Sequence, residues 1–150
     1  MVRKRAARRV AAASAAICAL IVAAVVGANA PTGRYEVDVD TIYDTKTKLT
    51  WQRLSSGNMM TQSNAIAYCL NLSLDGAPWR LPTVKELSSL IDVSSSAPAI
   101  DSAFNSASST ELWSASPVAG PPNSGWSVDF EFGSVYPSNA TDLNHARCVR

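Results

Sequence analysis

The segment Trp79–Asp92, which reads WRLPTVKELSSLID, constrains the fold more than any other stretch of this 150-residue chain. Pro82 favours an extended backbone at the residue before it. Thr83 and Glu86 then match a capping box, in which each side chain accepts a hydrogen bond from the other residue's backbone N–H at the start of a helix. Apolar residues follow at the spacing of one helical face, namely Leu87, Leu90 and Ile91. The segment therefore predicts a helix over about Val84–Asp92.

Residues 1–28 have the layout of a secretory signal peptide. Basic residues come first, an uncharged and mostly apolar run covers Val10–Gly27, and small residues follow. We expect cleavage after Ala28. Cleavage after Ala30 is the alternative, although it would place Pro31 at the new terminus, where signal peptidases act poorly. An uncleaved membrane anchor is the other interpretation, since about 18 apolar residues approach the length that spans a bilayer.

Removal of the signal peptide changes the charge balance of the protein. The whole chain has 13 Lys and Arg against 12 Asp and Glu, and five of the basic residues precede Val10. The mature chain thus keeps eight basic residues and has a net charge near −4. Proteins of this sign are poor general binders of nucleic acid. The mature length of about 120 residues corresponds to one domain, which we place at 35–150 after a short leader at 29–34.

The cysteines of the mature chain are Cys69 and Cys148, because Cys18 lies in the signal peptide. An exported protein meets an oxidising environment, which favours a disulfide between them. Two free thiols or a metal-binding pair are the alternatives, but a zinc site needs about four ligands and His145 is the only histidine. We therefore expect a Cys69–Cys148 disulfide, no metal and no cofactor.

The first half of the mature chain predicts a hairpin and a helix. Residues Tyr35–Tyr43 alternate in polarity, and a turn at Asp44–Thr47 leads to a second strand at Leu49–Trp51. A helix is expected over about Thr61–Leu72, with Thr61 or Ser63 as its N-cap. The residues expected on its buried face are Ile66, Cys69 and Leu70.

The second half predicts short strands. Trp126–Phe132 alternates between apolar and polar residues, as in a half-buried strand, and Gly133-Ser134 forms a turn to a partner at Val135-Tyr136. Leu112–Ser114 and Ala146–Arg150 are further candidate strands. Two short helices, a mainly antiparallel sheet and long loops make an α+β fold.

Several stretches of the mature chain follow one another in an order typical of a known family. They are Tyr43–Trp51, Ala67–Cys69, Trp79–Asp92, Pro98–Asp101, Leu112–Ser116, Trp126–Phe130 with Gly133, and Arg147–Arg150. This set resembles the C-terminal domain family of the Legionella collagen-like adhesin, over Tyr35 to Arg150. The resemblance implies an exported bacterial domain with a C-type-lectin-like fold and the Cys69–Cys148 type of pairing. It also implies surface exposure, trimerisation and binding of sulfated glycosaminoglycans, as in the namesake.

The chain differs from the namesake in having no collagen-like stalk and an acidic mature charge. We therefore expect a secreted, periplasmic or cell-surface adhesion domain without enzymatic activity, which binds a glycan or an envelope protein, with homo-oligomerisation left open. The alternative is a membrane-anchored structural or assembly component of the cell envelope without a small ligand. A membrane contact is expected only if the N-terminal segment stays uncleaved.

Candidate ligand-binding residues come from side-chain chemistry. Trp113 and Trp126 are candidates for stacking on sugar rings, with core packing as the alternative. Asn123 lies close to Trp126 in sequence, and Arg147 and Arg150 are candidates for a basic patch. Calcium binding is not expected, because few oxygen ligands converge in sequence. A catalytic site is not expected either, because no serine lies in a Gly-x-Ser-x-Gly turn and the only histidine lacks a partner set.

Overall fold

The computed structural model describes residues 30–150, except residues 77, 105–110 and 121. The expected signal peptide and its cleavage after Ala28 lie outside the described residues. Within the described part of the chain, no helix has the length and apolar character needed to cross a membrane.

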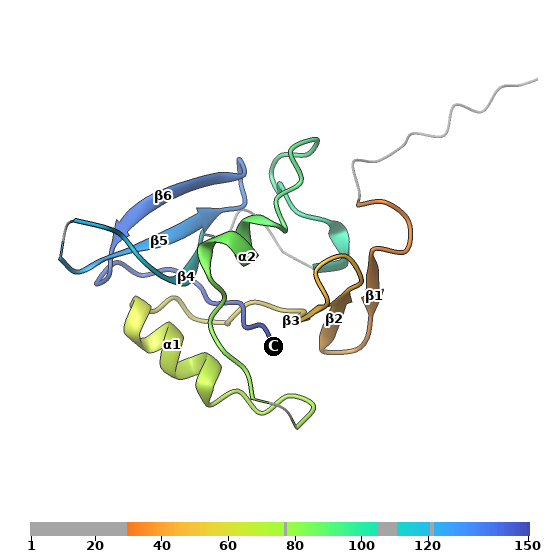
Figure 1. Cartoon of the computed structure of the whole chain (residues 1–150), viewed down its shortest axis with the longest axis horizontal. Helices are drawn as coiled ribbons and strands as arrows, with labels where there is room; N and C mark the ends of the chain where they lie inside the picture. Colours follow the sequence, from red (N-terminus) through yellow and green to blue (C-terminus); the bar gives the residue numbers. More distant parts are fainter. Residues whose placement is uncertain (1–29, 77, 105–110, 121) are drawn as a thin grey trace, which may run out of the picture.

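The fold consists of two antiparallel three-stranded sheets and two short helices (Figure 1). The first sheet has the order β1-β2-β3 and the second the order β4-β5-β6. The bounds are β1 Tyr35–Val37, β2 Thr41–Asp44, β3 Leu49–Gln52, α1 Gln62–Leu70, α2 Val84–Ser88, a 3-10 helix η1 Ser102–Phe104, β4 Glu111–Pro117, β5 Ser124–Asp129 and β6 Ser134–Asn139. The α+β class with antiparallel pairing is confirmed. Its relation to C-type lectins stays a prediction.

The two predicted hairpins are present, with one added interruption. β2 and β3 pair across the turn that follows Asp44, and β5 and β6 pair across the turn that contains Gly133. Gly133 has φ +71°, and a Cβ atom there would lie 2.8 Å from the Ile91 side chain, which explains why glycine occupies this turn. The alternating stretch before Tyr43 is split into β1 and β2.

The capping box at the start of α2 is confirmed. The Thr83 hydroxyl accepts a hydrogen bond from the Glu86 backbone, and the Glu86 carboxylate accepts one from the Thr83 backbone. The helix is shorter than predicted and ends at Ser88. After this point Asp92 N–H donates to the carbonyl of Ala99, so the backbone leaves the helix and pairs with a segment seven positions further on.

Helix α1 begins at the expected N-cap, Thr61, but its buried face differs from the prediction. Ala65 and Cys69 are fully buried, whereas Ile66 and Leu70 are 39% and 66% exposed. The predicted face was therefore wrong for Ile66 and Leu70. Ala65 and Cys69 belong to a core cluster with two indole rings, and small side chains let the helix approach these rings closely.

The C-terminal residues return through the centre of the fold. Val149 forms backbone bridges with both Trp51 of β3 and Arg80. Cys148 forms the expected disulfide with Cys69 of α1, with a Cα–Cα distance of 5.4 Å. The predicted closing strand is therefore present as isolated bridges to two segments rather than as a continuous strand.

Candidate functional site

One face of the second sheet has a polar region beside the buried Trp113, which pairs with Ser127. The register pairs Glu111 of β4 with Asp129 of β5, and Ser127 of β5 with Tyr136 of β6. Paired residues point to the same side of a sheet, so these four side chains share one face. The neighbouring strand residues Leu112 and Val128 point to the other face and are buried in the apolar core.

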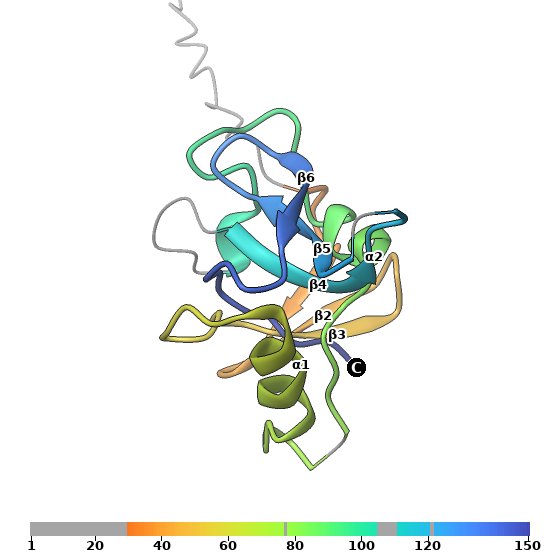
Figure 2. The same cartoon turned by 90° about the vertical axis from the view of Figure 1, so that its left-hand side faces the viewer.

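The segment after β6 covers the end of this polar face. Figure 2 shows it, in dark blue, passing between β4 and α1. Backbone hydrogen bonds fix its place: Asn144 exchanges two with Met60, and His145 N–H donates to the carbonyl of Glu111. These bonds bring Asn144 and His145 beside Glu111, which is more than thirty positions earlier in the chain.

Two cavities lie along the polar face, and we call them together the sheet groove. The larger has a volume of about 670 Å³ and the smaller about 300 Å³. Glu111, Tyr136 and Asn144 line both. The remaining lining residues of the larger cavity are Ser124, Pro137, Ser138, Asn139 and Asp142. Those of the smaller cavity are Met59, Asp129, Glu131 and His145.

Hydrogen bonds hold the shared side chains in place. The Asn144 amide donates to Glu111 Oε1 at 2.7 Å, and the Ser138 hydroxyl donates to the same oxygen at 3.1 Å. Burial and a hydrogen bond with Glu111 both raise the pKa of Tyr136, so its phenol stays protonated at neutral pH. The shared side chains therefore present a carboxylate, an amide and a neutral hydroxyl in a fixed arrangement.

The ends of the sheet groove are also ordered. At the larger cavity, Asn139 N–H donates to the Asp142 carboxylate at 3.0 Å. At the smaller cavity, His145 Nδ1 lies 2.7 Å from the carbonyl oxygen of Ser56. Because a carbonyl oxygen only accepts, Nδ1 carries a proton and donates it to this oxygen.

The charge of the sheet groove is negative. Its carboxylates are Glu111, Asp129, Glu131 and Asp142. Of the described residues that line the two cavities, none is Lys or Arg. A cleft lined by charges of one sign repels ligands of that sign. The groove is thus suited to hydrogen bonding with polar groups that carry no negative charge. No group of three or more His, Cys, Asp or Glu side chains among the described residues is arranged to hold a metal ion.

The structure contradicts two of the predicted ligand residues. Trp113 is fully buried, and its indole N–H donates to the carbonyl of Met60 at 2.8 Å, so its ring is packed in the core and does not reach a ligand. Arg147 is 1% exposed, and its guanidinium lies 5.0 Å from the centre of the Phe104 ring. Arg147 therefore cannot form a surface patch with Arg150. Arg150 instead stacks on Trp79 and forms an ion pair with Asp75 at 2.6 Å.

The remaining predicted ligand residues lie apart from the shared wall of the sheet groove. Trp126 is half-buried and pairs with Pro137, which places its ring on the opposite face of the sheet from Glu111. Asn123 is exposed, has φ +61°, and accepts a hydrogen bond from Ala140 N–H through its carbonyl. The sequence interpretation missed Glu111 and Asn144, because nothing local indicates that they meet. The predicted hairpin partner at Val135-Tyr136 was the only signal available.

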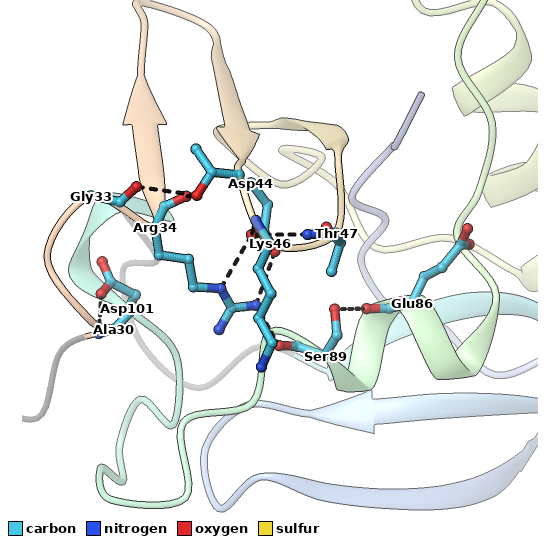
Figure 3. Close-up of polar contacts among 10 residues, drawn as sticks. Ala30, Gly33, Arg34, Asp44, Lys46, Thr47, Glu86, Ser89 and Asp101 are labelled. Atoms are coloured by element: carbon cyan, nitrogen blue, oxygen red, sulfur yellow. Dashed lines mark hydrogen bonds and ion pairs between the residues drawn. The ribbon is translucent and has the colours of Figure 1, made fainter.

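A second polar cluster holds the start of the described chain against the domain (Figure 3). Arg34 donates two hydrogen bonds to the Asp44 carboxylate and one to the carbonyl of Ser89 at 2.9 Å. Ala30 N–H donates to Asp101 at 2.7 Å. Burial alone would raise the pKa of Asp44, but the bonds from Arg34 and from the Lys46 backbone outweigh it and lower that pKa. The polar groups of this cluster form hydrogen bonds with one another, so we assign the cluster a structural role.

The family described as the Lcl C-terminal domain matches residues 40–150, which include every strand and helix named above except β1. A search of curated proteins finds no match.

Proposed function

Because the chain belongs to the Lcl C-terminal domain family, we propose that it is an exported, non-enzymatic adhesion domain that binds a glycan at the sheet groove. The family suggests an adhesin-associated domain at the cell surface. The Cys69–Cys148 disulfide supports export, because such bonds persist in oxidising compartments.

The observation that carries the proposal is the ordered set of polar groups shared by both cavities. Sugar hydroxyls act as donors and acceptors at once, so they suit a site that offers a carboxylate, an amide and a phenol side by side. Glu111, Asn144 and Tyr136 supply these three groups, and existing hydrogen bonds hold them in place. A site fixed before binding loses less conformational entropy when the ligand arrives.

The proposal that the domain is not an enzyme has its own support. Both cysteines of the described chain are in the disulfide, so neither supplies a thiolate. The proton-bearing nitrogen of His145 faces the carbonyl of Ser56 and therefore has no carboxylate partner that would orient it as a base in a triad.

A glycan array, run with and without calcium, tests the proposal. We expect binding to at least one glycan class, with no change when calcium is removed. Tyr136→Phe should weaken that binding about tenfold, the usual effect of losing one or two hydrogen bonds. Tyr43→Phe is the matched control, because Tyr43 lies in the first sheet and outside the sheet groove. Absence of binding to any glycan by folded protein, or equal losses in both variants, would contradict the proposal.

A further inference from the structure

The two cavities of the sheet groove differ in the chemical groups that line them as well as in volume. The larger, of about 670 Å³, adds hydroxyl and amide groups from Ser124, Ser138 and Asn139 to the shared wall. The smaller, of about 300 Å³, adds His145 and the carboxylate of Glu131. Both volumes lie within the usual range of about 300–1,000 Å³ for pockets that bind small molecules.

The shared wall makes one ligand across both cavities more favourable than two separate ligands. Glu111, Tyr136 and Asn144 line each cavity, so a chain-like ligand that crosses them can contact the groups at both ends. The second unit of such a ligand binds as part of an already held molecule, and its effective concentration is therefore high. Affinity should rise with chain length until both cavities are filled.

The charge of the walls then selects among chain-like glycans. Carboxylates stand at both ends of the groove, Asp142 at the larger cavity and Glu131 at the smaller. A sulfate or uronate on any unit of the ligand would come close to one of them, and no described Lys or Arg of the lining offsets the repulsion. Hydroxyl and acetamido groups meet no such penalty and can donate to the same carboxylates.

We infer that the sheet groove binds an uncharged oligosaccharide of at least two sugar units across its two cavities, and that it discriminates against sulfated glycans. This inference rests on the proposed function and specifies the class of ligand. It departs from the sulfated ligand that the family resemblance implies, because the lining of this chain's groove has the opposite charge to the one that such a ligand needs.

Calorimetric titration of the folded protein tests the inference with defined probes. The probes are glucose and N-acetylglucosamine oligomers of one to six units, heparin oligosaccharides, and deacetylated glucosamine oligomers. We expect affinity for an uncharged series to rise about tenfold or more from one unit to two or three and then to level off. Heparin oligosaccharides should not bind at about 0.15 M salt, where nearby charges still repel.

Two variants separate the cavities. Asp142→Asn alters only the larger and Glu131→Gln only the smaller. Each variant should lower the affinity for the longer oligomers about three- to tenfold, the range expected for the loss of one hydrogen bond to a charged group. A single sugar unit should respond to one variant and not to the other. Asp38→Asn is the control, because Asp38 is an exposed carboxylate between β1 and β2.

Several results would overturn the inference and leave the proposed function intact. They are binding of heparin oligosaccharides as strong as that of the uncharged series, equal affinity for one and six units, and binding restricted to the amine-bearing oligomers. Each of them would still show a glycan in the groove, provided that Tyr136→Phe weakens it. Absence of binding to every probe would overturn both the inference and the proposed function.

Discussion

Arg147 shows how strongly the surroundings of a single residue determine its role. As a candidate for a basic patch it was expected at the surface, yet it is 1% exposed. Its guanidinium donates to the carbonyls of Gln52, at 2.9 Å, and of Arg53, and it lies over the Phe104 ring. Burial lowers the pKa of Arg147. Guanidinium groups nevertheless stay protonated in proteins, and carbonyl dipoles compensate the buried charge here.

Replacement of Arg147 by Lys should destabilise the protein clearly. Lysine keeps the charge but loses the planar fork that reaches several carbonyls at once, so buried acceptors lose their partners. We expect the free energy of unfolding in urea to fall by about 2–3 kcal/mol. Arg150→Lys is the control and should cost about 0–1 kcal/mol, because its ion-pair partner Asp75 is 71% exposed. Similar losses in the two variants would mean that the buried contacts of Arg147 contribute little.

At the scale of elements, the best-defined unit is the start of α2 with the arginine before it. Glu86 accepts hydrogen bonds from the Thr83 backbone and from both terminal nitrogens of Arg80, at 2.7 and 2.8 Å. The bonds from Arg80 and then those from Thr83 outweigh partial burial and lower the pKa of Glu86 to about 2. The stability that Glu86 gives to the start of α2 therefore depends on pH.

Glu86→Gln should remove part of the acid sensitivity of the fold. The pKa of Glu86 is about 2 in the folded state and about 4.3 in an unfolded chain. The stabilisation by the carboxylate is thus complete above about pH 4.5 and is lost as pH falls toward 2. Because Arg80 is 46% exposed and solvent screens the pair, we expect only about 1 kcal/mol between wild type and variant at pH 6.

The measurement is the free energy of unfolding of both proteins across pH 2–7. Their difference should be largest at neutral pH and should disappear near pH 2. Other carboxylates with lowered pKa, such as Asp44, titrate in both proteins and cancel in the difference. A difference that stays constant across this range would show that the charge of Glu86 does not stabilise α2.

Elements with a complete local signal could be predicted, and elements defined by distant contacts could not. The capping box at Thr83 depends on neighbouring residues, and the turn at Gly133 is indicated by a glycine that tolerates its positive φ, so the sequence alone indicates both. The buried face of α1 depends instead on which side meets the indole rings of the core. Hydrophobicity alone predicted Ile66 inside, but the close approach of the helix required Ala65.

For the molecule as a whole, the candidate site was missed because it too is defined by contacts between distant parts of the sequence. The sheet groove needs Glu111 from β4, Tyr136 from β6 and Asn144 from the returning C-terminal segment. Composition alone indicates that residues 30–150 are acidic, with 12 Asp and Glu against eight Lys and Arg. It did not show that carboxylates from separate segments gather on one sheet face. That arrangement depends on the path of the last residues, which pass β4 before they reach β3 and Arg80.

The Cys69–Cys148 disulfide holds this path, so its removal should affect stability and binding together. The bond closes a loop of 79 residues, and in the chain-entropy description it stabilises the fold by about 4.5 kcal/mol. The double variant Cys69→Ala/Cys148→Ala should unfold at a lower urea concentration, and its free energy of unfolding should fall by about 4.5 kcal/mol. Hydrogen exchange of the amides of Asn144 and Val149 should also accelerate, because the bond anchors the segment that contains both.

Reduction provides the control for this prediction. Dithiothreitol should destabilise the wild type toward the level of the double variant and leave the variant unchanged. If the C-terminal segment loosens, glycan binding should weaken in the double variant even under conditions where the protein stays folded, because Asn144 belongs to the shared wall of the groove. Unchanged exchange at Asn144 with a large loss of stability would contradict this link, and the groove would then depend on the Asn144–Met60 backbone bonds rather than on the disulfide.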